Sequence, residues 1–216
     1  MIVALDGSGD FSKIQDAIDA IPINNQEPVT IQVRCGVYRE KLTFPHNKPF
    51  ITLIGEDRDK TIITYDDRAK TLNTRGEEIG TFGSPSVFIY GHDFTAKNLT
   101  FENTAGEGQG QAVAVRAEAD RLTFINCAFK GHQDTLFANG ENRQYYYQCY
   151  IAGDVDFIFG SATAVFDECD IVSLRKRGGY LTAASTPEGR EFGYVFLNCR
   201  LLGDVDQGSV WLGRPW

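Results

Sequence analysis

Hydrophobic and polar residues alternate in short stretches along most of this chain. Examples are "VTIQV" at 29–33, "TIITY" at 61–65 and "LTFINC" at 122–127, which Gly, Asn and Asp residues separate from their neighbours. Such stretches are rich in β-branched and aromatic residues, and their period of two predicts short β-strands. The pattern therefore indicates an all-β fold.

One segment near the start follows a helical period instead. Apolar residues recur there at three- and four-residue steps and stop before a proline: Ile14, Ala17, Ile18, Ile21 and Pro22. This spacing predicts an amphipathic helix over residues 13–21, with Ser12 and Gln15 as a capping box. A helix at this place is suited to cover the open end of a stack of strands.

A weak internal repeat runs through the rest of the chain. Each copy has an aromatic residue, any residue, a residue with an amide or carboxyl group, and in most copies a cysteine. The copies are FENT (101–104), FINC (124–127), YYQC (146–149), FDEC (166–169) and FLNC (196–199), which start 23, 22, 20 and 30 residues apart. Repeats of this length are typical of solenoids, whose units cannot bury their apolar face alone. We therefore predict a parallel β-helix in which the five copies stack as consecutive coils.

Four of the five cysteines occupy the same position of the repeat: Cys127, Cys149, Cys169 and Cys199. Neighbours in register would lie about 4.8 Å apart with parallel Cβ vectors, which suits a disulfide poorly. No CxxC or His-rich spacing accompanies them, which argues against a metal site. We expect one inward-facing column of reduced thiols that binds no metal.

Length and charge limit the possible classes of function. The 216 residues contain no linker or low-complexity stretch, so we expect one domain, residues 1–216. The net charge of −8 argues against nucleic acid or an anionic membrane as a partner, and no apolar run is long enough to span a bilayer. The N-terminal "MIVALDGSGD" lacks the features of a signal peptide, so we expect either an intracellular protein or a processed or truncated chain.

Two aspartates and two glutamines repeat with the spacing of the coils. Asp134 and Asp156 are 22 residues apart, as are Gln111 and Gln133. If one coil spans this interval, the carboxyl groups stack on neighbouring coils and the amides stack beside them. Because adjacent residues of a strand point to opposite faces, Gln133 and Asp134 can reach one site only across a bend or bulge. The alternative for the glutamines is an internal amide ladder.

Asp156 lies in the apolar segment "VDFIF", where an isolated carboxylate would be costly. Arg214 is the candidate partner through a bidentate contact; the alternative is that Asp156 caps a turn and Arg214 forms a surface ion pair. Repulsion from an ionised Asp156 would raise the pKa of Asp134 and favour its protonated form. This predicts a nucleophile and an acid, with the two amides as oxyanion donors in acyl transfer.

Several motifs in combination resemble those of the pectin methylesterases, which demethylate homogalacturonan. They cover essentially the whole chain and read "DGSGDFSKIQDAIDAIP", "LTFENTAG", "GQAVAVR", "GHQDTLF", "NRQYYYQCYIAGDVDFIFGSA" and "LGRPW". The resemblance implies an all-β, single-stranded, right-handed parallel β-helix with a short N-terminal capping helix, and no metal or other cofactor. It also implies a secreted or extracellular protein that acts on pectin, and we expect a monomer.

The resemblance also assigns roles by motif position. Asp156 would be the nucleophile that attacks the C6 carbonyl of a methylated galacturonate, Asp134 the general acid and later base, and Arg214 the residue that orients Asp156. Gln111 and Gln133 would hold the oxyanion. The residues that would contact the substrate are Thr81, Gln111, Phe159, Arg214 and Trp216.

The chain departs from that family at three points. Members of the family continue beyond "LGRPW", so we expect the family's C-terminal coils to be missing, the last coil to be uncovered and Trp216 to be mobile. His132 stands where plant members carry Tyr, and Asp154 stands where they carry Thr and adds negative charge near the nucleophile. The competing functions are those of a chain-cleaving polygalacturonase or pectate lyase and of a non-catalytic pectin-binding β-helix.

Overall fold

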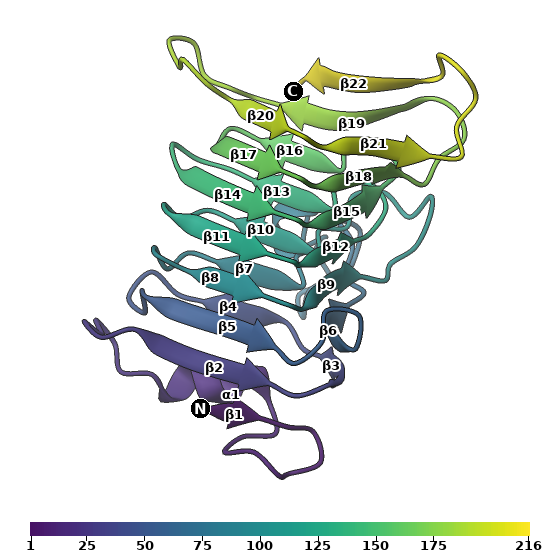
Figure 1. Ribbon diagram of the computed structural model, residues 1–216. Coiled ribbons are helices and arrows are strands. Elements are labelled where there is room, and N and C mark those ends of the chain that lie inside the picture. The colour runs from purple at the N-terminus through teal and green to yellow at the C-terminus, as the bar shows by residue number, and fades with distance from the viewer.

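The structure, a computed structural model, describes residues 1–216 and is built mainly of short strands. The strands form three parallel sheets, A, B and C, and the chain visits them in this order, so that each circuit stacks on the one before (Figure 1). The two termini lie at opposite ends of the stack. This is a parallel β-helix, as the repeat predicted.

Each sheet takes one strand from each coil. Sheet A contains β1 (Ile2–Val3), β2 (Val29–Val33), β5 (Ile51–Gly55), β8 (Thr95–Lys97), β11 (Leu122–Ile125), β14 (Arg143–Tyr147), β17 (Thr163–Asp167) and β20 (Tyr194–Leu197). Sheet B contains β3 (Gly36–Arg39), β6 (Thr61–Tyr65), β9 (Thr100–Asn103), β12 (Ala128–Lys130), β15 (Tyr150–Gly153), β18 (Asp170–Ser173) and β21 (Arg200–Gly203). Sheet C contains β4 (Leu42–Phe44), β7 (Val87–Ile89), β10 (Val115–Ala117), β13 (Leu136–Ala138), β16 (Ile158–Gly160), β19 (Gly179–Ala184) and β22 (Val210–Pro215).

The single α-helix, α1 (Ile14–Ala20), covers the N-terminal end of the stack and buries its apolar face in the core, as predicted. The predicted capping box is wrong, since the N-cap residue is Lys13 and no side chain caps from there. Glu40, between β3 and β4, instead accepts hydrogen bonds from the N–H groups of Ile14 and Gln15 at 3.0 and 3.1 Å. The Gln15 side chain is engaged elsewhere, because its Oε1 accepts a bond from the Thr43 N–H. No helix of the structure has the length and apolar character needed to cross a membrane.

The repeat marks the corner between sheets A and B. Its aromatic residues point inwards and stack with ring centroids 4.7–4.8 Å apart: Phe124, Tyr146, Phe166 and Phe196. The polar residue of each copy turns the chain with a positive φ of 49–52°: Asn126, Gln148, Glu168 and Asn198. Asn is one of the few residues that adopt this left-handed conformation readily, because its short side chain can hydrogen-bond locally. The aromatic residue of the repeat therefore marks the core, and its polar residue marks the corner.

The first copy, FENT, does not belong to this column. Phe101 lies in β9 of sheet B and pairs with Phe129 of β12, whereas β8 of sheet A places Ala96 beside the next aromatic of the column. The corner residue of that coil is Asn98, which has a φ of 56°. The prediction of five stacked copies is thus wrong for FENT. Sheet B also alternates inward apolar and outward polar residues, so a four-residue pattern does not distinguish the two sheets.

The four repeat cysteines form one column directly after this corner, as predicted. Cys127, Cys149 and Cys169 are buried free thiols, and Cys199 is a half-buried one. The Sγ atoms of the last three lie 3.2–3.4 Å from carbonyl oxygens of the preceding coil. Burial raises the pKa of Cys127 to about 12, so this thiol packs as a small uncharged hydrophobe.

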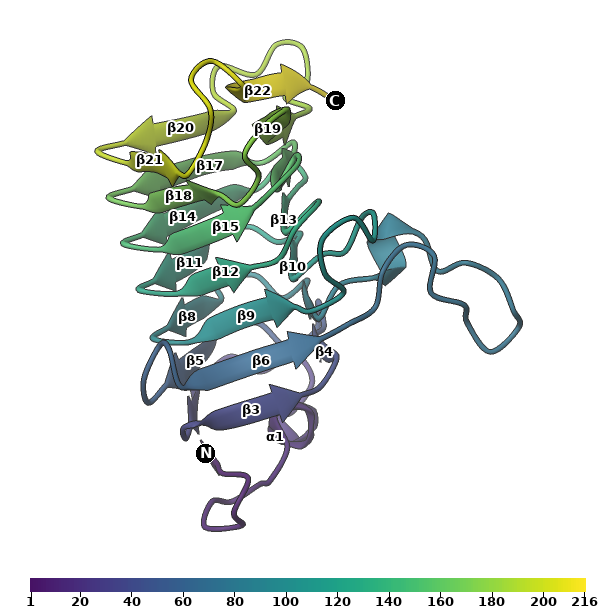
Figure 2. The same ribbon diagram turned by 90° about the vertical axis from the view of Figure 1, so that its right-hand side faces the viewer.

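Two segments leave the coils and project sideways from the stack (Figure 2). The longer, residues 66–86, connects β6 to β7 and contains a 3₁₀ turn, η1 (Thr81–Gly83). The shorter, residues 104–114, connects β9 to β10. The Ala69 N–H donates to the Gln111 carbonyl at 2.8 Å, so the two segments support each other.

Candidate active site

The two predicted acids lie at the corner between sheets B and C. Asp134 is in the turn between β12 and β13, and Asp156 is in the equivalent turn of the next coil, between β15 and β16. Both are buried and have a positive φ, of 66° and 51°. The Asp134 N–H donates to the Val155 carbonyl at 3.1 Å, which keeps the two turns in register. The left-handed residue supplies the bend that Gln133 and Asp134 need to reach one site.

Arg214 holds Asp156 through two hydrogen bonds. The guanidinium Nε lies 3.0 Å from Oδ1, and Nη2 lies 2.6 Å from Oδ2. In sheet C, Phe159 of β16 pairs with Ala183 of β19, and Ala183 pairs with Arg214 of β22. Arg214 therefore lies two strands beyond the coil that contains Asp156. The bidentate contact predicted from the sequence is present, and the alternative of a surface ion pair does not apply because Asp156 is buried. Two parallel bonds fix the plane of a carboxylate as well as its charge.

Asp134 has no cation partner of its own. Burial, and after it the negative charge of Asp156, raises the pKa of Asp134 to about 7, while Arg214 and a hydrogen bond with Gln133 oppose the shift. The direction agrees with the prediction, although burial outweighs the repulsion on which the prediction rested. Near neutral pH, the site therefore combines a carboxyl group that exchanges its proton with a carboxylate that is paired to a permanent cation.

The two glutamines lie beside the acids on successive coils. The Ala112 N–H donates to the Gln133 carbonyl at 3.1 Å, which brings Gln111 next to Gln133 as their spacing predicts. The Gln133 side chain is close enough to the Asp134 carboxyl group to lower its pKa. Both glutamines are half-buried. Both residues are thus partly accessible to solvent, and amide N–H groups in such a position could hold a developing negative charge.

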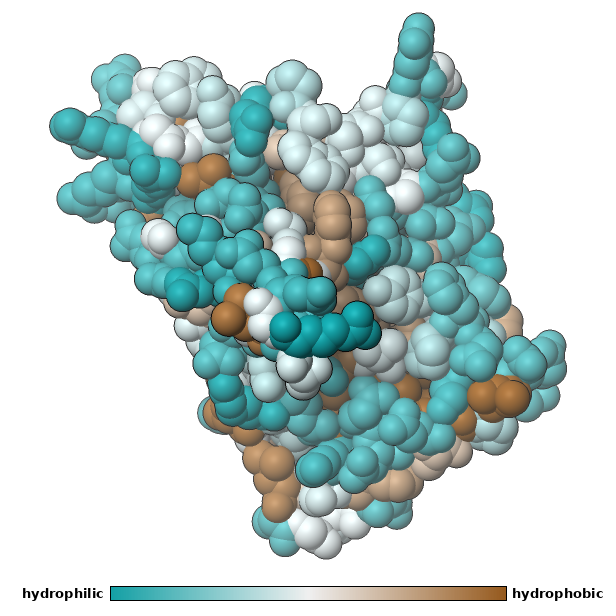
Figure 3. Space-filling model, turned by 180° about the vertical axis from the view of Figure 1, so that it is seen from behind, coloured by the Kyte–Doolittle hydropathy of each residue, from teal (hydrophilic) through white to brown (hydrophobic).

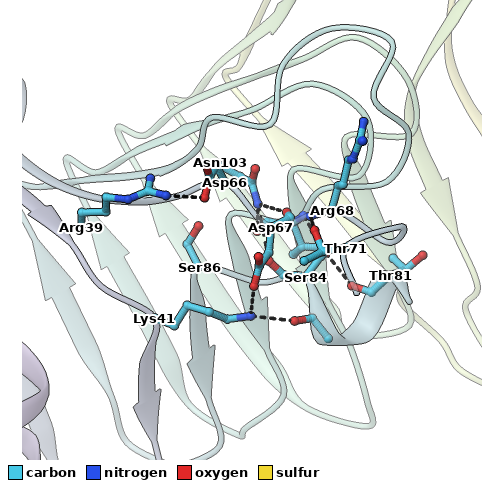
Figure 4. Close-up of polar contacts among 12 residues, drawn as sticks. Arg39, Lys41, Asp66, Asp67, Arg68, Thr71, Thr81, Ser84, Ser86 and Asn103 are labelled. Carbon is cyan, nitrogen blue, oxygen red and sulfur yellow. Dashed lines mark hydrogen bonds and ion pairs between the residues drawn. The ribbon is translucent and has the colours of Figure 1, made fainter. Parts of the chain in front are cut away.

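Thr81 lies on η1, which a polar network fixes to the coils (Figure 4). Lys41 Nζ lies 2.5 Å from the Asp67 carboxylate and donates to the Gly83 carbonyl at 2.9 Å. Asn103 donates to the Asp67 carbonyl at 2.9 Å. A partly buried ion pair with further hydrogen bonds keeps its geometry. The turn that carries Thr81 is therefore held by Lys41, which directly precedes β4, and through Asp67 by Asn103 of β9.

An aromatic cluster covers the outer face of sheet C next to the acids. Phe137 and Phe159 stack in register with centroids 4.6 Å apart; Trp216 packs edge-on against Phe159 at 5.6 Å, and Phe82 of η1 lies 5.2 Å from Phe137. Phe159 is 2% exposed, whereas Phe82 and Trp216 are 45% and 55% exposed. A ligand would therefore meet Trp216, which packs on Phe159, and Phe82, which packs on Phe137. From this side, an apolar band with hydrophilic borders runs through the upper half of the molecule (Figure 3).

Known proteins resemble this chain over its whole length. The family model described as pectinesterase matches residues 1–216. Pectinesterase 31 of Arabidopsis thaliana is 45% identical over 219 residues, which cover 99% of this chain and 68% of that protein. The chain belongs to the pectinesterase family.

Solved structures agree as well. A pectin methylesterase from carrot has a TM-score of 0.90 and 36% identity over 100% of this chain and 68% of its own. A pectin methylesterase in complex with a hexasaccharide has a TM-score of 0.89 and 35% identity over 100% of this chain and 70% of its own. Among the curated relatives, this pectinesterase spans 58% of the length of Pectinesterase QRT1 of Arabidopsis thaliana, with 40% identity and 100% of this chain covered.

Three residues that border this candidate site were not predicted from the sequence. Phe82 directly follows Thr81, and Phe137 precedes Phe159 by 22 residues, the same interval as between the two acids. That interval was the signal that could have identified Phe137. Arg116 of β10 donates to the Phe82 carbonyl at 3.0 Å and stacks over the rings of Phe82 and Phe137 at 5.4 and 5.8 Å. It lacks a sequence signal because only the fold brings β10 next to η1.

Proposed function

We propose that this pectinesterase hydrolyses the methyl esters of galacturonate residues in pectin and releases pectate and methanol. The observation that carries the proposal is the bidentate Arg214–Asp156 pair beside Asp134, a carboxyl group with a pKa of about 7. A fixed carboxylate and a proton donor side by side are what ester cleavage without a serine nucleophile requires. The membership of the family and the relative solved with a hexasaccharide support the class of substrate.

In the first half-reaction, an Asp156 oxygen attacks the C6 carbonyl carbon of a methylated galacturonate. Arg214 keeps the attacking carboxylate ionised and aimed, and the amide N–H groups of Gln111 and Gln133 stabilise the tetrahedral oxyanion. Asp134 donates its proton to the methoxy oxygen as the C–O bond breaks, so that methanol leaves. The products are methanol, an acyl-enzyme anhydride on Asp156 and an ionised Asp134.

In the second half-reaction, the ionised Asp134 takes a proton from water. The resulting hydroxide attacks the anhydride carbonyl, the bond to Asp156 breaks, and the galacturonate leaves as a free acid group that ionises. Asp134 is then protonated again and Asp156 is free. A pKa of about 7 allows Asp134 to give and take the proton near neutral pH without a large cost in either direction.

The surface beside these residues suits a sugar chain. Trp216 and Phe82 offer exposed aromatic rings against which the apolar face of a sugar can pack, and Thr81 adds a hydroxyl group on the same rigid turn. We propose these three residues, with Gln111 and Arg214, as substrate contacts. Phe159 contributes by supporting Trp216.

We further propose that residues 1–216 act as one domain and as a monomer outside the cell. One buried cluster of 39 residues extends from α1 through the successive coils, which supports a single domain. Pectin is a polymer of the plant cell wall, which supports an extracellular site of action and pectin itself as the partner.

The test compares the wild type with Asp156→Asn and Asp170→Asn on methylated pectin. Asp170 is held by Arg200 with two bonds of 2.6 Å and so provides a matched bidentate pair away from the site. We expect the wild type and Asp170→Asn to release methanol without shortening the polymer, and Asp156→Asn to release none while its circular dichroism spectrum is unchanged. New reducing or unsaturated ends would instead indicate a chain-cleaving enzyme, and pectin binding without methanol would indicate a binding protein.

A further inference from the structure

A histidine–aspartate contact lies at the same corner as the two proposed catalytic acids. His132 and Asp154 are 22 residues apart on successive coils, like Asp134 and Asp156. The Nδ1 atom of His132 lies 3.2 Å from the Oδ2 atom of Asp154, and the Asp154 N–H donates to the His132 carbonyl at 3.2 Å. Since an ionised carboxylate only accepts hydrogen bonds, Nδ1 carries the proton of this contact.

Asp154 is a buried carboxyl group with an incomplete set of partners. It is 6% exposed, and its Oδ1 atom is buried without any hydrogen-bond partner. His132 is its only ion-pair partner, and no Lys or Arg contacts it. A buried carboxylate in this state costs free energy, which packing of the coil alone does not explain.

The charges around Asp134 are unbalanced. Of the three buried carboxyl groups, Asp134, Asp154 and Asp156, only Asp156 is paired with an arginine, because both side-chain bonds of Arg214 go to it. The negative charge of Asp154 adds to burial and to Asp156 in raising the pKa of Asp134, against the opposing charge of Arg214. The negative charge of Asp154 therefore raises the pKa of Asp134, the proposed proton donor.

The other side of the pair faces solvent. His132 borders a cavity of about 410 Å³ whose charged lining residues are Glu102 and Lys130. Its imidazole is half-buried, while the Asp154 carboxyl behind it is buried. Protons can thus reach His132 from solvent without crossing the proposed catalytic site.

We propose that Asp154 and His132 are positioning residues for the acid step: Asp154 keeps a negative charge beside Asp134, and His132 holds that carboxylate in place. The inference rests on the proposed ester hydrolysis. The charge of Asp154 makes the proton of Asp134 harder to remove, so the acid remains protonated to higher pH.

The first test removes the charge and keeps the shape. In Asp154→Asn, the midpoint of the Asp134 titration, followed by ¹³C NMR of labelled aspartate and assigned with Asp134→Asn, should fall below that of the wild type, because one of the negative charges that raise the pKa of Asp134 is removed. The alkaline limb of the pH profile for methanol release should move with it. Asp204→Asn, which removes the same charge from a side chain that is 94% exposed, should change neither. An unmoved midpoint in Asp154→Asn overturns the inference.

His132→Gln separates electrostatics from packing. Glutamine retains an N–H donor for Asp154 but cannot become charged, so the Asp134 midpoint should stay at or above that of the wild type. A purely structural role would lower the rate at every pH in both variants and move no midpoint, which would also overturn the inference. If the midpoint falls in Asp154→Asn while the wild type releases no methanol, the electrostatic inference stands and the proposed function fails.

Discussion

Two of the three corners of the β-helix use the same left-handed backbone conformation but carry different side chains. At the corner between sheets A and B, left-handed residues carry amides and carboxyls that hydrogen-bond one another: Asn126 donates to Asn98, and Gln148 donates to Glu168, both at 2.9 Å. At the corner between sheets B and C, the left-handed residues are buried aspartates. There Asp156 needs an arginine, and Asp134 keeps its proton up to a pH of about 7.

The difference shows what converts a structural corner into a candidate active site. Stacking places like side chains about one strand spacing apart in both cases. Amides pair under these conditions, because each supplies a donor and an acceptor, whereas two buried carboxylates repel each other. Burial and like charge at the B–C corner thus create the shifted pKa, while partial exposure and pairing at the A–B corner stabilise the stack.

The largest expected effect follows from Asp134→Asn, which removes the carboxyl group with the raised pKa from the B–C corner. Turnover should fall by about 10³-fold, as expected for loss of a general acid and base. The folded state keeps the proton of Asp134 to about pH 7, whereas the unfolded chain loses it near pH 4. The stability that this proton contributes is complete below that pH and is lost as the pH rises through about 7.

The free energy of unfolding of Asp134→Asn, measured with denaturant, should therefore exceed that of the wild type at pH 8 by on the order of 2–4 kcal/mol more than it does at pH 4. Glu168→Gln at the A–B corner is the matched control, for which we expect no comparable dependence on pH. Equal behaviour of the two variants would mean that the corners do not differ electrostatically.

Arg214→Gln tests the second distinguishing feature, the bidentate pair. Asp156 would stay buried without its cation and lose its fixed orientation, so kcat should fall by about 10²-fold. Arg200→Gln breaks the bidentate pair with Asp170 on sheet B, whose geometry is similar, and should leave kcat within twofold of the wild type. A comparable loss in both variants would assign the effect to stability of the last coils.

Trp216→Ala addresses the aromatic surface beside the B–C corner. We expect KM for methylated pectin to rise by about tenfold with a smaller change in kcat, because the ring contributes to binding and takes no part in the chemistry. The other tryptophan of the chain, Trp211, lies on β22, the strand that ends directly before Trp216, and stacks on Tyr180 at 5.5 Å. Trp211→Ala should leave KM nearly unchanged, and a similar rise in both would argue against a specific contact.

The smallest effect is expected from Asn126→Ala at the A–B corner. Alanine pays a steric penalty at a φ of 49°, and the hydrogen bond to Asn98 is lost, so unfolding should become easier by about 1 kcal/mol. Asn126→Gly, which accepts the conformation, should recover part of this loss. The rate of methanol release per folded molecule should be unchanged in both, which thermal unfolding and activity assays on the same samples can check.

The sequence by itself was sufficient for features that recur along the chain. The alternation of strands and the aromatic–polar–cysteine repeat predicted the coils, and the interval of 22 predicted that Asp134 and Asp156 meet. A solenoid converts spacing in sequence directly into position in space, because each coil stacks on its neighbour in register. The bidentate partner of Asp156 could be named for a different reason: a buried carboxylate needs a cation, and Arg214 lies in one of the few constrained motifs.

Only the tertiary structure decided which residues meet across different elements. Glu40 caps α1 from another coil, and FENT belongs to sheet B although its pattern fits sheet A. Burial outweighs repulsion in raising the pKa of Asp134, and the cover of Phe159 by Trp216 depends on how the last strand packs. Burial, desolvation and contacts between elements depend on all the surrounding atoms together. The spacing of residues along the sequence does not specify them.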